Sequence, residues 1–340
     1  MKKKILFFGG SSFLAHCWCN HIDHNSEIFL GVHNKSPESE NYTNIKFDFD
    51  SEKDLTEKIS SLNLDFIVNC IGYTNVENCE INYQQALRIN SGYAAVVSKV
   101  SKKLNVKLVH ISTDHLFDGK TNNNDENAKP NPLNNYAKTK LEGEEQVLKF
   151  NEDALIIRTN FFGWGPIHKK SFSDFIISSL ENNISISLFS DVNYNPILVS
   201  ELADAVNTLI DKKCVGIYNV VSNETVSKLD FGHLLAKEFN LDDKLIQASM
   251  LSSRKELVDR PLNMTLSIKK LNSEDIFVKS LEEQIRDLKK QQPKLNHGLI
   301  NKKIIPYGRQ NISEKDIQEV VKVLKSDYLT QGPVTVKFEK

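Results

Sequence analysis

Residues 4–15 have the sequence KILFFGGSSFLA. The apolar run Ile5–Phe8 has the length of a strand, and two glycines and a segment of helical spacing follow it directly. A tight turn from strand to helix leaves the first backbone amides of the helix free, and the pyrophosphate of a dinucleotide can bind there. In a Gly-x-x-Gly-x-x-Gly template Gly9 matches, while Ser12 and Ala15 replace the other glycines. The stretch therefore predicts strand, turn and helix, and leaves open whether the turn binds a cofactor or is only structural.

The same alternation of strand and helix continues along the chain, which is typical of an α/β protein with a parallel sheet wound by helices. Each helical segment is long enough to return the next strand parallel to the last. The predicted strands are Lys4–Phe8, Glu27–Gly31, Asn44–Phe47, Phe66–Cys70, Lys107–Ser112, Ala154–Arg158 and Gly216–Val221. The predicted helices are Phe13–Ile22, Lys53–Ser61, Asn82–Leu104, Asn134–Phe150, Phe172–Leu180 and Val199–Ile210. This order predicts a Rossmann-type doubly wound parallel sheet, with a ligand crevice beyond the carboxyl ends of the strands.

The regular alternation fades in the second half, so we expect a smaller C-terminal substrate-binding lobe beside the Rossmann domain. A stretch rich in Lys and Gln after this lobe has the composition of a linker, and a helix start follows it. The predicted division is a Rossmann domain at 1–160 with 197–222 returning to it, a lobe at 161–196 and 223–285, a linker at 286–303, and a separate segment at 304–340.

Composition narrows the classes of partner. The 340 residues are 40% hydrophobic and carry 43 basic against 44 acidic side chains, a net charge of −1, so no excess of positive charge attracts nucleic acid or an anionic membrane. No apolar run approaches the roughly 20 residues of a membrane span, and the basic start lacks a cleavage pattern. We expect a cytoplasmic protein. Its five cysteines are interpreted as reduced thiols, and the sequence predicts no metal site.

A phenol and an ammonium are spaced to share one helix face. Tyr136 and Lys140 are four residues apart at the start of the predicted helix Asn134–Phe150. An adjacent ammonium lowers the pKa of a phenol, which would let Tyr136 act as an acid or base nearer neutral pH. The alternative is an ordinary pair on a helix surface. The position favours a catalytic role for the pair, because it follows Ser112-Thr113-Asp114 at the end of a predicted strand.

Taken together, these segments resemble the extended short-chain dehydrogenases, and within them the branch similar to dTDP-4-dehydrorhamnose reductase. The resemblance covers roughly residues 4–290. It rests on the turn at Gly9 and on FIVNCIGYTNVE at 66–77, HISTDHLFDG at 110–119, YAKTK at 136–140, IRT at 157–159 and RPLN at 260–263.

The resemblance implies an NAD(P)-dependent oxidoreductase that acts on a nucleotide-activated sugar. Thr113, Tyr136 and Lys140 would be the catalytic trio: Tyr136 protonates the sugar C4 oxygen as hydride arrives, Lys140 tunes Tyr136 and holds the ribose, and Thr113 orients the carbonyl. Cofactor contacts are expected from Gly9, Ser11, Ser12, Phe13, Leu14, His33, Lys35, Asp48, Phe49, Cys70, Ile71, Gly72 and Lys140. Substrate contacts are expected from Tyr73, Asp114, His115, Asn195 and Arg260.

The end of the second predicted strand bears on the choice of cofactor. An acid there binds the ribose hydroxyls of NAD, whereas a base accepts the 2′-phosphate of NADP. The residues at 31–35 are GVHNK, without an acid. NADP is therefore favoured over NAD, through His33 or Lys35.

Three other functions are compatible with the same fold. A 4,6-dehydratase needs a further acid and base, and its relatives place Asp-Glu after the Thr; here Thr113 is followed by Asp114 and His115, which favours reduction. An epimerase stays open, as does a non-catalytic subunit that binds a nucleotide sugar or cofactor. His115 stands where the branch usually has Tyr, and the alternative to a substrate contact is a loop histidine that only packs or caps.

The last segment resembles a different family. Residues 304–340, from IPYGRQ at 305–310 to DYLTQGP at 327–333, are similar to the start of the pyridoxal-phosphate aminotransferases that act on nucleotide-linked 4-keto sugars. Their Schiff-base lysine lies further downstream than Lys340. We therefore expect the chain to be the first part of a bifunctional protein or a truncated piece of one, in deoxy- or amino-sugar synthesis for surface polysaccharide. A homodimer is also compatible with the resemblance.

Overall fold

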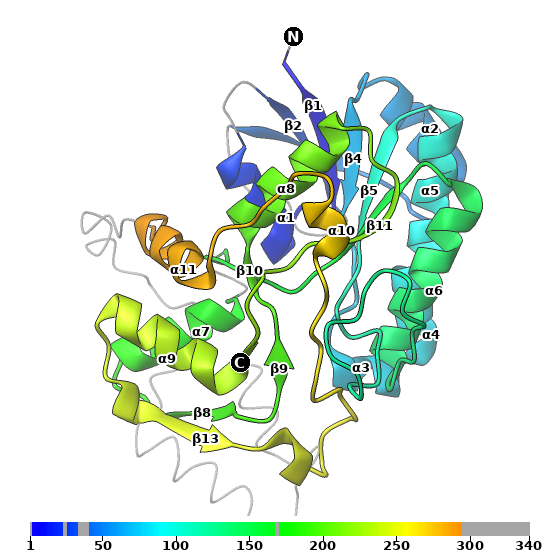
Figure 1. Cartoon of the computed structure of the whole chain (residues 1–340). Helices are drawn as coiled ribbons and strands as arrows, with labels where there is room; N and C mark the ends of the chain where they lie inside the picture. Colours follow the sequence, from blue (N-terminus) through cyan, green and yellow to red (C-terminus); the bar gives the residue numbers. More distant parts are fainter. Residues whose placement is uncertain (1, 23–25, 33–40, 167–169, 294–340) are drawn as a thin grey trace, which may run out of the picture. The chain divides into compact units, whose positions relative to one another are not determined.

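A seven-stranded sheet, parallel throughout, forms the centre of the computed structural model, which describes residues 2–22, 26–32, 41–166 and 170–293 (Figure 1). The strands lie in the order β11-β6-β5-β4-β1-β2-β3. Their bounds are β1 Lys4–Phe8, β2 Glu27–Val32, β3 Tyr42–Lys46, β4 Phe66–Asn69, β5 Lys107–Ile111, β6 Leu155–Arg158 and β11 Gly216–Asn219. The order reverses between β1 and β4, and this is the point at which doubly wound sheets bind ligands. The predicted Rossmann-type sheet is confirmed.

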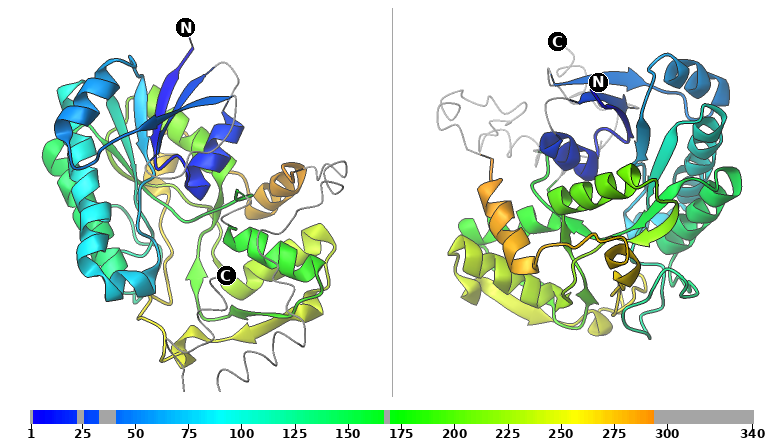
Figure 2. Two further views of the ribbon diagram at one scale, coloured as in Figure 1. Left: turned by 180° about the vertical axis from the view of Figure 1, so that it is seen from behind. Right: turned by 45° about the horizontal axis from the view of Figure 1, so that its top comes forward.

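Helices cover both faces of this sheet (Figure 2). On one face lie α2 (Glu52–Ser60), α5 (Tyr93–Lys103) and α6 (Asn135–Phe150); on the other lie α1 (Phe13–His21) and α8 (Val199–Asp211). The long helix predicted over 82–104 is α4 (Tyr83–Leu87) and α5, joined by a π-helical turn at Arg88–Gly92. Helix α3 (Val76–Ile81), before it, was not predicted. None of the helices in the described residues is long and apolar enough to cross a membrane.

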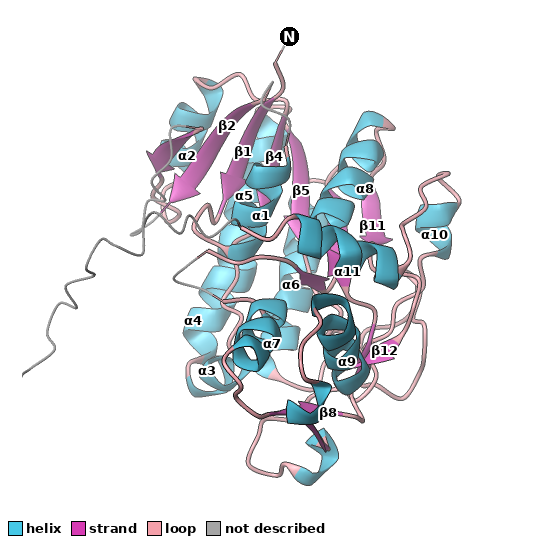
Figure 3. Ribbon diagram, turned by 90° about the vertical axis from the view of Figure 1, so that its left-hand side faces the viewer, coloured by secondary structure: helices cyan, strands magenta, loops and turns pink. Residues whose placement is uncertain are grey.

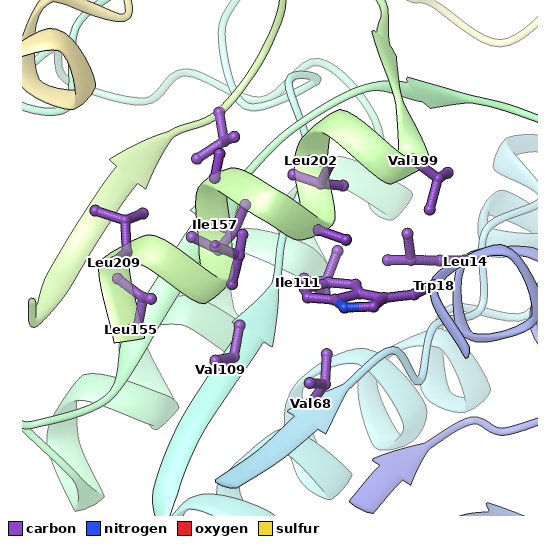
Figure 4. Packing of buried hydrophobic residues seen from close by; sticks show 14 of the residues in the cluster. Leu14, Trp18, Val68, Val109, Ile111, Leu155, Ile157, Val199, Leu202 and Leu209 are labelled. Carbon is purple, nitrogen blue, oxygen red and sulfur yellow. The ribbon is translucent and has the colours of Figure 1, made fainter. Parts of the chain in front are cut away.

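The alternation of side chains along β1 explains why both faces are covered. Ile5 and Phe7 belong to the apolar cluster under α1 and α8, whereas Leu6 and Phe8 belong to the cluster under α2, α5 and α6. Trp18 of α1 is fully buried, with its ring centroid 5.7 Å from that of Phe7. Figure 4 shows Trp18 and neighbouring side chains of α1 and α8 filling the space above the strands. Each such large side chain contributes roughly 1.5–3 kcal/mol on burial.

A second group of elements has its own apolar core on the side where β1 and β2 end (Figure 3). It contains α7 (Phe172–Glu181), α9 (Lys228–Phe239) and α11 (Leu281–Lys290), and the parallel pair β8 (Ile186–Phe189) and β13 (Ile246–Ser249). The smaller elements are β7 Phe161–Phe162, β9 Asn193–Tyr194, β10 Ile197–Leu198, β12 Val226–Ser227, α10 Lys269–Asn272 and the 3₁₀ turns Asp243–Leu245 and Leu251–Ser253. We call these elements the lobe, apart from β7, β10 and α10. The domain boundaries predicted above stay predictions.

The predicted linker at 286–303 is wrong at its start, because α11 extends to Lys290. Leu281, Ile285 and Leu288 follow helical spacing and are buried in the lobe core, and a capping box between Ser280 and Glu283 begins the helix. Glu282, Glu283, Arg286 and Lys290 occupy the exposed face of this amphipathic helix, whereas Gln284 is buried. Residues 294–303, and the aminotransferase-like segment 304–340, lie outside the described residues.

A close contact between α6 and the π-helical turn gives a first stability prediction. A Cβ on Gly143 would overlap the backbone oxygen of Asn90, whereas a Cβ on Gly92 would meet nothing nearer than 4.0 Å. Gly143→Ala should therefore lower the free energy of unfolding by about 1–3 kcal/mol, because backbone must move to make room. Gly92→Ala is the matched control and should leave it unchanged or raise it by up to ~1 kcal/mol. Urea titration of both variants checks this, and equal effects would contradict the contact.

Candidate active site

Three cavities follow one another along the carboxyl ends of the strands. The cofactor cavity, of about 540 Å³, is lined by the turn after β1 and by the ends of β2 and β4. The central cavity, of about 320 Å³, shares Ser12, Cys70, Ile71 and Gly72 with it. The lobe cavity, of about 350 Å³, shares Val76 and His115 with the central cavity. Because neighbouring cavities share lining residues, the three form a path from the glycine turn to the lobe.

The turn after β1 has the backbone that a bound pyrophosphate requires. Gly9 has a φ of +76°, and a Cβ there would lie 3.1 Å from the backbone of Cys70. The amide of Ser12 donates to the carbonyl of Gly9 over 2.8 Å, and the Ser12 hydroxyl accepts from the amide of Ala15 over 3.2 Å as the N-cap of α1. The Ser12 side chain is thus used in capping its own helix, and Gly9, Ser11 and Ser12 still line the cavity.

Most of the predicted cofactor residues line this path. Gly9, Ser11, Ser12, Asp48, Phe49, Cys70, Ile71 and Gly72 line the cofactor cavity. Phe13, Leu14 and Lys140 line the central cavity instead. Phe49 stacks on Tyr93, with ring centroids 5.0 Å apart, and both rings border the cofactor cavity. His33 and Lys35 lie outside the described residues. The residues present fit a dinucleotide.

The predicted catalytic trio lines the central cavity. Helix α6 begins at the N-cap Asn134, whose side chain accepts from the amide of Ala137 over 2.9 Å, and so presents Tyr136 and Lys140 one turn apart. Lys140 Nζ donates to the carbonyl oxygen of Ile111, at the end of β5, over 2.6 Å. Thr113 follows the same strand, and its side chain lies close enough to the phenol of Tyr136 to lower the pKa of that group. Tyr136 and Lys140 line one cavity, as their helical spacing predicts, and Thr113 lines it as well; their catalytic roles stay predictions.

The expected direction of the Tyr136 pKa is wrong. Burial raises the pKa of Tyr136 to about 12, although the nearby hydroxyl of Thr113 opposes this shift, and Asp114 adds to it. Burial lowers the pKa of Lys140 to about 8, against the favourable charge of Glu144. The ammonium of Lys140 donates to the Ile111 carbonyl, and its charge is not among the influences on the Tyr136 phenol. Burial therefore decides the pKa of Tyr136. Tyr136 is therefore a protonated acid at neutral pH.

Several polar atoms at the central cavity have no partner among the described residues. They are Ser112 Oγ, Thr159 Oγ1 and His115 Nδ1, all buried. The His115 ring meets the Tyr136 ring edge to face, with centroids 5.7 Å apart, and burial lowers the pKa of His115 so that it is neutral near pH 7. Asp114 is buried beside them and accepts from Asn160 Nδ2 over 2.7 Å. Buried polar atoms of this kind gain from a polar ligand.

Of the remaining residues predicted to contact the substrate, only Arg260 lines one of the three cavities. Arg260 lines the lobe cavity and forms an ion pair with Glu77 of α3. Asn195 lines none of the three cavities: its amide donates to Glu224 O and Thr225 Oγ1 and accepts from Leu266 N, so it holds the chain together. Tyr73 lines none of them either, and its backbone is hydrogen-bonded to the side chain of Asn90. The structure gives Asn195 and Tyr73 no direct place at these cavities.

Sequence reasoning missed several polar residues that border the path, and three of them are informative. Thr159 faces the central cavity, Arg88 borders the cofactor cavity, and Lys228 borders the lobe cavity. Only Lys228 left a local signal. It directly follows Ser227, the N-cap of α9, and so places a cation in the first turn of a helix, where the helix dipole disfavours positive charge.

Comparisons with known proteins agree with this geometry. A probable low-salt glycan biosynthesis reductase, Agl14 of Haloferax volcanii, is 29% identical over 230 residues, 66% of this chain and 76% of that protein. The dTDP-4-dehydrorhamnose reductase of Aggregatibacter actinomycetemcomitans is 26% identical over 249 residues, 68% of this chain and 83% of that protein. The crystal structure of dTDP-4-dehydrorhamnose reductase from Bacillus anthracis in complex with NADP superimposes with a TM-score of 0.74 at 22% identity, covering 86% of this chain and 100% of that one. With a match to the family model over residues 3–292, the chain belongs to the RmlD substrate binding domain family.

Proposed function

We propose that this protein is an NAD(P)H-dependent reductase of a nucleotide-linked 4-keto-6-deoxy sugar, in the synthesis of deoxy or amino sugars for surface polysaccharide. One observation carries the proposal: a protonated tyrosine and a buried lysine face the cavity that joins the dinucleotide cavity to the lobe cavity. The two curated relatives described above are a probable reductase and a reductase of this kind. NADP is the favoured cofactor, since the Bacillus anthracis structure contains it.

Tyr136, Thr113 and Lys140 have different roles in the proposed reduction of the carbonyl. The nicotinamide supplies the hydride. Tyr136, with its raised pKa, holds the proton that the sugar C4 oxygen must receive as that oxygen becomes an alkoxide. Thr113 fixes the phenol and is placed to orient the carbonyl, while the Lys140 ammonium supplies positive charge beside the developing anion.

A turnover assay tests the proposal. The purified chain is mixed with NADPH and dTDP-4-dehydrorhamnose, and absorbance of the reduced nicotinamide is followed, with NADH and with UDP- and GDP-linked 4-keto-6-deoxy sugars as comparisons. We expect oxidation of NADPH that depends on a 4-keto sugar, with slower oxidation of NADH. Interconversion of sugars without net oxidation would point to an epimerase, and binding without turnover to a non-catalytic subunit. Either outcome would overturn the reductase proposal.

The pKa of Lys140 predicts the pH dependence of the reaction. The free enzyme holds Lys140 protonated below about pH 8, and Tyr136 stays protonated to about pH 12. Therefore kcat/KM should fall as the pH rises through about 8, because Lys140 loses its charge while the acid itself is unaffected. Lys140→Arg keeps its charge to a far higher pH and should remove the Lys140 contribution to this fall, at a lower absolute rate. A wild-type profile that is flat from pH 6.5 to 9.5 would contradict the assignment.

A further inference from the structure

The lobe cavity has an unusual charge distribution. Its lining includes the rings of Phe172, Phe175 and Phe189, the cations of Lys228 and Arg260, and His115. No carboxylate is among the described residues that line it. A cavity with two cations and no acid creates a positive potential, and partial exclusion of water strengthens it.

Lys228 has no evident structural partner for its charge. Its Nζ lies 3.3 Å from the ring centroid of Tyr194 and 5.0 Å from that of Phe172. Within the described part of the chain its ammonium has no hydrogen bond or ion pair, although the charge of Asp114 favours the protonated form. The first turn of α9 offers it no favourable dipole. The aromatic contacts hold the ammonium at the cavity wall without neutralising it.

The second cation, Arg260, is held by a different element of the fold. Arg260 is paired with Glu77, whose helix α3 follows the sheet strand β4, whereas Lys228 belongs to the lobe. Both cations act electrostatically on His115, which lies between the central and lobe cavities. The two charges therefore converge on the entrance through which a substrate would pass its sugar to Tyr136.

We propose that Lys228 is a substrate-binding residue that, with Arg260, binds the diphosphate of the nucleotide sugar and so fixes the sugar over Tyr136. This inference rests on the proposed function. A diphosphate supplies the negative charge that the lining of this cavity lacks, and charge-assisted bonds from an ammonium and a guanidinium suit its oxygens. The aromatic rings leave an apolar region of the same cavity for the nucleoside.

The protonation of Lys228 offers an independent readout. Burial lowers the pKa of Lys228 to about 8, and Asp114 is the nearby acid that opposes this shift. The other groups that face it are His115, Arg260 and the Tyr194 ring, and none of these supplies negative charge near neutral pH. A bound diphosphate raises the pKa of Lys228 again, so binding at pH 8 should take up a proton.

Calorimetric titration of the full chain with dTDP tests the proposal, with thymidine as the ligand that lacks the diphosphate. Lys228→Met removes the charge and keeps the length of the side chain. It should weaken dTDP binding by roughly 10- to 100-fold and leave thymidine binding unchanged. Lys237→Met, on the same helix but 80% exposed, is the matched control and should change neither. Lys228→Arg should recover most of the dTDP affinity.

The outcomes separate this inference from the proposed function. Wild-type protein that binds dTDP with an affinity equal to that of Lys228→Met, or an equal loss for dTDP and thymidine, would overturn the role of Lys228 and leave the reductase proposal standing. Wild-type protein that binds neither dTDP nor UDP would overturn the substrate class itself. At pH 8 the binding enthalpy should depend on the buffer in the wild type and lose most of that dependence in Lys228→Met; unchanged dependence would contradict the proton uptake.

Discussion

Replacing Tyr136 by phenylalanine should lower kcat of the reduction by roughly 10²–10⁴-fold while the affinity for NADPH changes little. The hydroxyl is the acid of the central cavity, and its pKa of about 12 keeps the proton on it throughout the physiological range. Phenylalanine retains the ring, including its edge-to-face contact with His115, so the cavity keeps its shape. The decrease in kcat therefore measures the contribution of the transferred proton and not that of side-chain packing.

A second tyrosine provides the control for this substitution. The hydroxyl of Tyr218 donates to Glu274 over 3.0 Å, and Tyr218 lines none of the three cavities. Tyr218→Phe should leave kcat within about twofold of the wild type, since it removes the same atom from a site without chemistry. Stopped-flow measurement of a single turnover isolates the chemical step. Full single-turnover rate in Tyr136→Phe would remove Tyr136 from the mechanism.

The fold could be predicted well where the pattern is local. The strands at 4–8, 66–69 and 107–111 follow short apolar runs, and their order follows from the right-handed crossovers between them. The shared cavity of Tyr136 and Lys140 follows from helical spacing alone. The pKa of Tyr136 could not be obtained in this way, because burial is set by segments distant in sequence, and here it outweighs the lysine.

In the lobe, the surroundings of a side chain are even harder to predict from the sequence. Lys228 reaches Tyr194 and the cavity of His115 and Arg260, so its surroundings come from three separate parts of the chain. The predicted linker at 286–303 includes the second half of helix α11, because the composition there is that of a solvated segment, although three leucine or isoleucine residues of the helix follow helical spacing. Periodicity was the better guide there than composition.

The buried ion pair under α6 gives the largest expected effect on stability. Arg158 at the end of β6 donates to both carboxylate oxygens of Glu144 in α6, over 2.7 Å from Nη2 and 3.0 Å from Nε, and both side chains are almost fully buried. Glu144→Gln leaves the guanidinium buried without a counter-charge. It should lower the free energy of unfolding by about 3–5 kcal/mol, measured by urea titration at pH 7.

The matched control is an exposed pair, Lys102–Glu152, at 2.7 Å with side chains 40% and 72% exposed. Glu152→Gln should cost at most about 1 kcal/mol, because solvent screens that pair. An equal loss in both variants would mean that burial does not decide the energy of these ion pairs. A double variant, Glu144→Gln with Arg158→Met, should regain much of the stability, since the unpaired charge is removed as well.

Glu144 also connects this stability to the chemistry, because its charge is the largest of the influences that hold the pKa of Lys140 up against burial. Without that charge the pKa of Lys140 falls further, so the decline of kcat/KM in Glu144→Gln should begin below pH 8. The double variant regains stability but not the carboxylate, and its pH profile should therefore stay displaced. Recovery of both properties together would mean that Glu144 acts on Lys140 only by positioning α6, whereas recovery of stability alone would show that its charge acts directly.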